Sequence, residues 1–112
     1  MDGLRILVAN EPRAYRETIA AALRCLRPLA EVVVGEPRSL DREVARVRPH
    51  LLLSSDPDAV ERDEVRSWVL LYPGGTSRIV VCIDGEQEIA VDLSFDDLLA
   101  VVDRAGKAAQ VG

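Results

Sequence analysis

Cysteine and histidine are scarce in this chain of 112 residues, which has two cysteines and one histidine. The cysteines, Cys25 and Cys82, lie far apart and form no disulfide framework, so reduced thiols in a cytosol are the simpler interpretation. His50 has no cysteine or second histidine at ligand spacing, and no serine has the flanking glycines of a nucleophile elbow. We therefore expect no zinc site, no other cofactor and no enzymatic activity.

Long apolar runs are also absent. A membrane-spanning helix needs about 18 or more apolar residues in succession, and the sequence has no such run. The first ten residues lack the pattern of a signal peptide, which favours a cytoplasmic location. The net charge of -5 repels phosphate backbones and anionic lipids, so we expect neither nucleic acid nor membranes as partners. With 48% hydrophobic residues the chain can bury one core, which predicts a single domain over residues 1–112.

The charges are spread unevenly. Residues 1–50 hold nine arginines against seven acids, whereas residues 51–112 hold five basic residues against twelve acids. Four arginines are expected on the outer face of the first helix: Arg13, Arg16, Arg24 and Arg27. Five acids lie between residues 86 and 97: Glu86, Glu88, Asp92, Asp96 and Asp97. Solvated faces and helix capping explain both sets, and contact with an oppositely charged partner or a second copy is the alternative.

In the first half of the chain, short apolar runs alternate with helix patterns. The runs at 4–9, 31–34 and 51–53 predict three buried strands. Helices are expected between them, the first capped by Asn10 or Glu11 and the second by Ser39. The apolar stripe of the first helix is Tyr15, Ile19, Ala22, Leu23 and Leu26, and that of the second is Leu40, Val44 and Val47. Strands that alternate with helices favour a parallel sheet.

The second half is less regular. The spacing of Val65, Trp68, Val69 and Tyr72 predicts a third helix near residues 60–72, ended by Pro73-Gly74-Gly75. Residues 79–83 form a fourth apolar strand, and a fifth strand is expected over 89–93. The few residues between them fit a hairpin and not a crossover, so the last strand should run antiparallel. Ser94 and Asp97 form the capping box of a last helix.

The residues around the ends of the first and third strands resemble those of response-regulator receiver domains. The resemblance rests on residues 6–12 with Arg16-Glu17, on residues 48–55, and on residues 94–99. It implies a flavodoxin-like, receiver-like three-layer α/β sandwich with a mostly parallel five-stranded sheet. The helix between the fourth and fifth strands would be missing, because the connection is too short to hold it.

The chain departs from the receiver pattern where the family's chemistry takes place. The acidic pair that holds magnesium in receivers becomes Asn10 and Glu11, and the phosphoacceptor position becomes Ser55, followed by Asp56. The family's hydroxyl residue falls at Cys82 or Ile83 and its lysine near Val91-Asp92, while the only lysine is Lys107. Magnesium needs carboxylate oxygens, and phosphoryl transfer needs cations that match the developing charge.

These departures predict a non-catalytic pseudo-receiver, a signalling or protein-interaction module without conventional aspartyl phosphorylation. One alternative is an atypical receiver phosphorylated on Asp56, with magnesium held by Glu11 and Asp56. Another is a small-ligand module that uses a pocket formed by Asn10, Glu11, Ser55 and Asp56. These four residues have a structural interpretation as well, in which they only cap a helix and turn the chain.

Loss of a helix should leave part of the sheet uncovered. An exposed apolar patch of that kind marks an interface, so we expect a protein partner or a homodimer. The candidate interface residues are Val81, Ile83, Trp68 and Tyr72.

Overall fold

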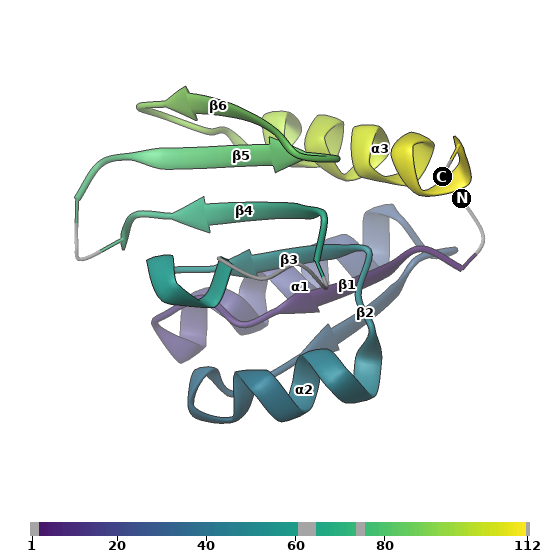
Figure 1. The fold of residues 1–112 in the computed structure, drawn as a ribbon, viewed down its shortest axis with the longest axis horizontal. Helices are drawn as coiled ribbons and strands as arrows, with labels where there is room; N and C mark the ends of the chain where they lie inside the picture. Colours follow the sequence, from purple (N-terminus) through teal and green to yellow (C-terminus); the bar gives the residue numbers. More distant parts are fainter. Residues whose placement is uncertain (1–2, 61–64, 74–75, 112) are drawn as a thin grey trace.

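The computed structural model describes residues 3–60, 65–73 and 76–111 (Figure 1). The first half contains β1 (Arg5–Val8), α1 (Arg13–Leu26), β2 (Glu31–Val34), the short 3-10 helix η1 (Pro37–Ser39), α2 (Leu40–Val47) and β3 (Leu51–Ser54). The second half contains the 3-10 helix η2 (Pro57–Val60), β4 (Ser67–Leu71), β5 (Ile79–Ile83), β6 (Glu86–Ala90) and α3 (Phe95–Val111). No helix within the described ranges is both long enough and apolar enough to cross a membrane.

The described strands form one mixed sheet in the order β2-β1-β3-β4-β5-β6. The pairs β1–β2, β1–β3 and β3–β4 are parallel, whereas β4–β5 and β5–β6 are antiparallel. The carboxyl ends of β1 to β4 therefore meet at one end of the sheet, which we call the carboxyl edge. The opposite end, where these four strands begin, is the amino edge.

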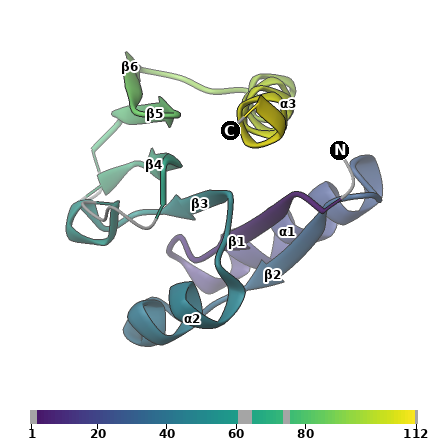
Figure 2. The same cartoon turned by 45° about the vertical axis from the view of Figure 1, so that its right-hand side comes forward.

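Helices cover the two faces of this sheet unequally. One buried cluster joins α1 and α3 to the sheet, and it includes Ile19, Leu23 and Val102. The other cluster joins α2 to the opposite face through Leu40, Val44 and residues such as Leu52. In Figure 2, α2 accordingly lies across the sheet from α3. This arrangement confirms a coarse α/β sandwich.

The sheet itself differs from the expected one, because it has six strands among the described residues and ends in two antiparallel pairs. The helix predicted near residues 60–72 is wrong where the structure describes it, since Ser67–Leu71 is β4. Val69 and Leu71 pack with one cluster, while Leu70 and Trp68 pack with the other. A strand buried on both faces carries apolar residues throughout, so its pattern includes helical spacings by chance. Residues 61–64 and 74–75, which the predicted helix and its terminating turn include, lie outside the described residues.

The predicted hairpin is confirmed, with its second strand three residues earlier than expected. Asp84 and Gly85 form the turn with φ of 50° and 90°. Two central residues with positive φ are typical of the tight turns that match strand twist, and Asp-Gly is a favoured sequence for them. Residues 85–88 were expected to connect the two strands, but Glu86 to Glu88 belong to β6, because an edge strand tolerates charged side chains. The capping box of α3 is also confirmed, since the Ser94 and Asp97 amides each donate to the other's side chain at 3.1 Å.

The expected pattern of α1 is partly wrong. Its buried residues are Arg16, Ile19, Ala20 and Leu23, so Arg16 faces inward, whereas Tyr15 and Leu26 are exposed. Neither Asn10 nor Glu11 caps α1, because Pro12 occupies the N-cap position without a side-chain hydrogen bond. Ser39 does stand at the N-cap of α2, but its side chain makes no capping bond.

Candidate functional site

The carboxyl edge brings together most of the residues that the sequence marks as a site. A cavity of about 600 Å³ opens there, and Glu11, Ser55, Asp56, Tyr15 and Tyr72 are among the residues that line it. Glu11 follows β1, Ser55 and Asp56 follow β3, and Tyr72 follows β4. Parallel strands place the residues that follow them at the same edge, which is where open α/β sheets bind ligands.

Ser55 joins the ends of β1 and β3. Its Oγ accepts a hydrogen bond from the Glu11 backbone N–H at 3.0 Å, and its hydroxyl donates to the Glu11 carbonyl at 3.4 Å. Both the acceptor and the donor of this hydroxyl are thus used to hold two loops together. The Ser55 side chain, which the resemblance places at the phosphoacceptor position, thus holds the backbone of the two loops in place.

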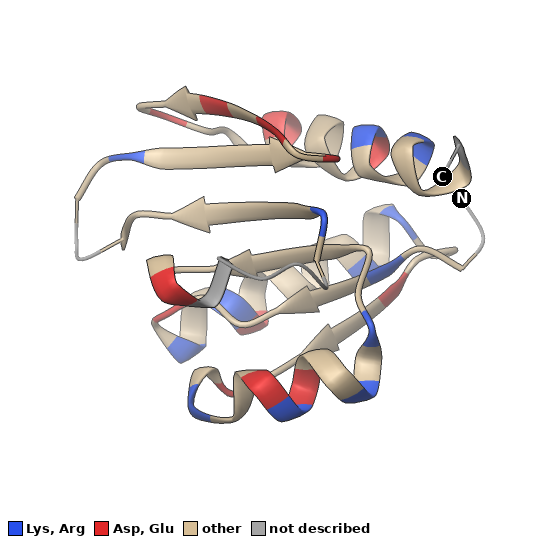
Figure 3. Ribbon diagram, viewed as in Figure 1, with Lys and Arg blue, Asp and Glu red and all other residues tan. Residues whose placement is uncertain are grey.

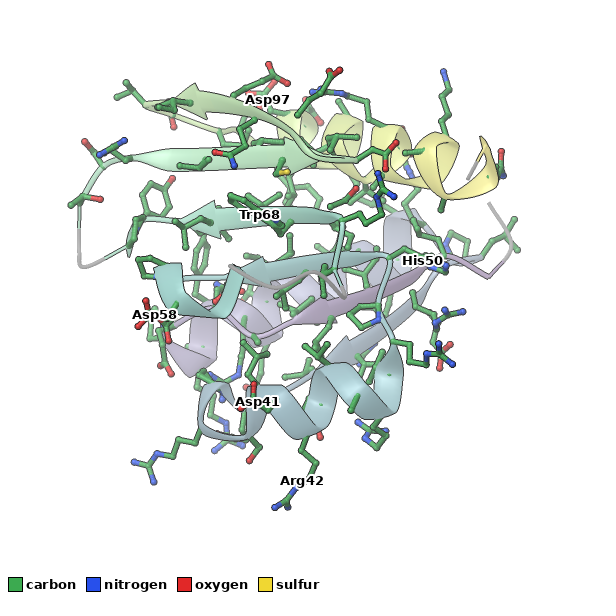
Figure 4. The ribbon with its side chains drawn as sticks, in the orientation of Figure 1. Asp41, Arg42, His50, Asp58, Trp68 and Asp97 are labelled. Carbon is green, nitrogen blue, oxygen red and sulfur yellow. The ribbon has the colours of Figure 1, made fainter. Side chains whose placement is uncertain are left out.

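Asp56 turns the chain into η2. Its Oδ1 accepts the Asp58 backbone N–H at 3.0 Å, and its own N–H donates to Ser54 Oγ at 3.1 Å. Asp58 is visible at this end of the sheet in Figure 4. The Asp56 side chain is exposed, and its second carboxylate oxygen has no hydrogen bond to the described residues.

Asn10 is fully buried, unlike the other three predicted site residues. Neither Oδ1 nor Nδ2 of its amide has a hydrogen-bond partner among the described residues. A buried amide without partners costs about 1–3 kcal/mol relative to a satisfied one. Its neighbours in sequence, Ala9 and Glu11, line the cavity, whereas Asn10 itself does not.

Arg16 is the residue of this edge that the sequence interpretation missed. Its side chain is only 3% exposed and lies between two largely exposed carboxylates. Nη2 is 3.3 Å from Glu36 Oε1, and Nη1 is 3.9 Å from Glu11 Oε1. Nε and Nη1 have no hydrogen-bond partner in the described structure. The available signal was its helical spacing of three, four and seven residues from Ile19, Ala20 and Leu23.

The carboxylates at this edge do not fit a receiver's magnesium site. Glu11 faces the Arg16 guanidinium, and Asp56 already accepts an amide with one oxygen. Asn10 contributes neither charge nor a side chain to the cavity. Among the described residues no group of three or more His, Cys, Asp or Glu side chains could hold a metal ion.

Two tyrosines, Tyr15 and Tyr72, line the cavity. Burial, and next the proximity of Tyr72, raise the pKa of Tyr15 above its ordinary value. Tyr72 has a φ of 48°, a left-handed conformation that is unusual for a residue with a bulky side chain. Tyr72 was expected at an interface, and the structure places it beside the site residues instead of on the sheet face.

The position expected for the family's hydroxyl residue is not at this edge. Cys82 and Ile83 end β5, which runs antiparallel to β4, so they lie at the amino edge. Cys82 is buried, and this burial raises the pKa of its thiol. Val91, near the expected lysine position, follows β6 at the carboxyl edge, but β5 separates β6 from β4, and Val91 is 74% exposed. The expected alignment took residues 79–83 for a parallel strand, whereas β5 runs antiparallel to β4.

The sheet also has an exposed apolar patch, formed by Trp68, Val80 and Ile89. Val80 pairs with Ile89 and both lie on the α2 face, as does Trp68 (labelled in Figure 4). Trp68 and Val80 are half-buried, and Ile89 is 66% exposed. Val81 and Ile83 point to the other face, where they pack in the cluster that contains α3. On the α2 face Val80 is thus half-buried, whereas Val81, one of the two residues of this strand expected to be uncovered, is buried.

Comparisons of this chain with protein-family models, with curated proteins and with solved structures find no match in any of the three.

Proposed function

We propose that this chain is a non-catalytic, receiver-like interaction module that acts through protein contact and without conventional aspartyl phosphorylation. The observation that carries the proposal is the free outer edge of β6, which adjoins the apolar patch. Within the described sheet β6 pairs with β5 alone, so its outer backbone N–H and C=O groups face no further strand. An edge of this kind accepts an added strand from another protein.

The chemistry of β6 defines the partner. Glu86 and Glu88 lie on the strand and Asp92 follows it, and Figure 3 shows acidic residues in red along this part of the ribbon. Ile89 and Val91 are the apolar residues that stand exposed among these acids. A complementary strand would therefore carry lysine or arginine and apolar side chains in alternation.

A second copy of the chain fits this edge less well. When two β6 strands pair about a two-fold axis, Glu86 and Glu88 meet the same acids of the other copy. Like charges directly opposite each other destabilise a strand pair. Arg104 offsets only part of this charge, through its ion pair with Glu88. We therefore infer a different protein with a basic strand as the partner.

A library of random peptides displayed on phage tests the partner chemistry. Peptides selected on the wild type should be rich in lysine and arginine that alternate with apolar residues. Ile89→Asp should weaken their binding about tenfold or more, because it places a charge in the apolar contact. Leu29→Asp is the matched control, because Leu29 is also 66% exposed but lies in the turn before β2.

Peptides without basic residues, or equal loss of binding in both variants, would contradict the inferred partner. Light scattering after size exclusion tests whether the chain instead forms a homodimer. A dimer that Ile89→Asp dissociates would replace the basic partner with a second copy.

The absence of aspartyl phosphorylation has a separate test. Magnesium with beryllofluoride or acetyl phosphate should leave the amide resonances of Asn10, Ser55 and Asp56 unchanged, because Glu11 and Asp56 are already engaged. Saturable shifts at these amides that disappear in Asp56→Ala would establish the atypical receiver in place of the pseudo-receiver.

A small-ligand module is the second candidate, and the cavity at the carboxyl edge favours it. A volume of about 600 Å³ suits a small molecule, and the unpartnered polar groups of Asn10 and Arg16 lie in the segments around it. A fragment screen monitored by NMR would support this candidate if hits shift the amide resonances of Ser55 and Tyr72 together. Hits that shift only the amide resonances of residues around Ile89 would favour the interaction module.

A further inference from the structure

A second cavity, of about 490 Å³, lies at the amino edge of the sheet, opposite the candidate site. Its polar lining comes from six residues in four segments of the chain: Arg5, Arg48, His50, Arg66, Ser67 and Asp84. Alanine side chains of α3 and Pro49 form the rest of the wall. Figure 4 shows His50 at this end, away from Asp58 at the carboxyl edge.

Strand pairing places these residues in one row. Ile6 pairs with Leu51 and Leu51 with Ser67, so the residues just before them, Arg5, His50 and Arg66, stand side by side. The His50 N–H donates to the Arg5 carbonyl at 2.8 Å, and the Arg5 N–H donates to His50 Nδ1 at 2.9 Å.

The arginines of this cavity keep hydrogen-bond donors free. Arg5 Nε donates to the carbonyls of Val47 and Arg48 at 3.0 and 2.9 Å, which fixes the guanidinium at the end of α2. Its terminal nitrogens make no hydrogen bond to the described residues. Arg48 and Arg5 have no carboxylate partner in the part of the chain that the structure describes, whereas Arg66 Nε pairs with Asp84 at 2.8 Å.

His50 adds a further donor. Because Nδ1 accepts the Arg5 amide, a neutral ring carries its proton on Nε2. Burial, and next the Arg5 charge, lower the pKa of His50, which keeps the ring neutral near pH 7. Asp84 is the one carboxylate among the lining residues, and it is already paired with Arg66.

From this arrangement we infer that the amino-edge cavity binds a small organic anion with a phosphate or carboxylate group. Arginine guanidinium groups bind both kinds of anion through paired N–H donors. A cavity of this volume lies within the range of small-molecule sites, and the alanine wall leaves room for the apolar part of a ligand. The site does not depend on the proposed function, because it lies at the amino edge and uses neither β6 side chains nor the apolar patch.

Titration with pyrophosphate and with citrate at low ionic strength, each followed by NMR, tests this inference. The imidazole signal of His50 is unambiguous because the chain has one histidine. We expect saturable shifts of this signal and of the Arg5 and Arg66 amides. A bound anion among the groups that face the ring, namely Arg5, Arg48, Arg66 and Asp84, should also raise the pKa of His50. Stronger binding of pyrophosphate or of citrate identifies the ligand as a phosphate or a carboxylate.

Arg48→Gln should weaken binding of the more tightly bound of the two anions about tenfold. It removes a charged donor whose side chain makes no hydrogen bond within the described protein. Arg42→Gln is the matched control, since it removes the same charge from the exposed side of α2 (Figure 4). Equal weakening in both variants would mean diffuse attraction and not a site, and it would overturn the inference. The absence of saturable shifts with either anion would overturn it as well.

Discussion

Replacing Arg16 by methionine should stabilise the protein. The guanidinium is 3% exposed, and its Nε and Nη1 have no hydrogen-bond partner in the described structure. Each unpaired buried donor costs about 1–3 kcal/mol, whereas an ion pair with a largely exposed carboxylate contributes about 0–1 kcal/mol. Methionine retains the apolar contact with the buried stripe of α1 and has a similar helix propensity. Glu11 and Glu36 remain hydrated because their side chains are 61% and 65% exposed.

From this balance we expect Arg16→Met to raise the free energy of unfolding by about 1–3 kcal/mol, within the range known for buried ion pairs replaced by apolar residues. Urea denaturation followed by Trp68 fluorescence measures the change, and the melting temperature should rise by about 5 °C or more. Arg13→Met is the control, because Arg13 is 75% exposed one turn earlier in α1 and should change stability by less than about 0.5 kcal/mol. A loss of 1 kcal/mol or more in Arg16→Met would refute the reasoning, since the two ion pairs would then outweigh the cost of burial.

Three further predictions concern α3 and the hairpin. Arg27 holds both oxygens of Asp103 at 2.8 Å and thereby lowers the pKa of Asp103. The stability that this ion pair contributes is present above the ordinary carboxyl pKa and is lost as the pH falls through the lowered pKa of Asp103. Asp103→Asn should therefore cost about 0.5–1 kcal/mol at pH 7 and nothing near pH 2 in urea unfolding. Ser94→Ala should cost about 1 kcal/mol in the same assay, because it leaves the Asp97 N–H uncapped. Gly85→Ala should cost about 1–2 kcal/mol in thermal unfolding, because a φ of 90° strains any side chain although open space surrounds the position.

Local patterns were sufficient to predict most of the elements. The strands at residues 31–34 and 79–83, the helix that begins after Ser39 and the capped α3 all lie where the sequence places them. Each has a local cause, such as a β-branched run or a capping box, which acts over a few residues. β4 has no local cause of this kind, because a strand covered on both faces takes its identity from its neighbours β3 and β5.

The candidate site was predicted in part for a similar reason. Glu11, Ser55 and Asp56 meet because they follow parallel strands, a rule that needs only the order of the elements. Asn10 follows the same strand, but its side chain alternates into the interior. Val81 was likewise expected to be uncovered but is buried, since the face that α3 covers decides whether Val80 or Val81 is buried. Such a choice depends on tertiary packing that periodicity does not contain.

One departure from the expected topology accounts for both proposed surfaces. Because β4 is a strand, the chain reaches the carboxyl edge at Tyr72 and must return along an antiparallel β5. That return brings the turn at Asp84 to the amino edge, where its carboxylate pairs with Arg66 and completes the lining of the basic cavity. The following strand, β6, then forms the end of the sheet, and its acidic outer edge stays free. A helix over residues 60–72 would have reversed β5 and removed both features, so the site for an anion and the edge for a basic strand have a single origin in the fold.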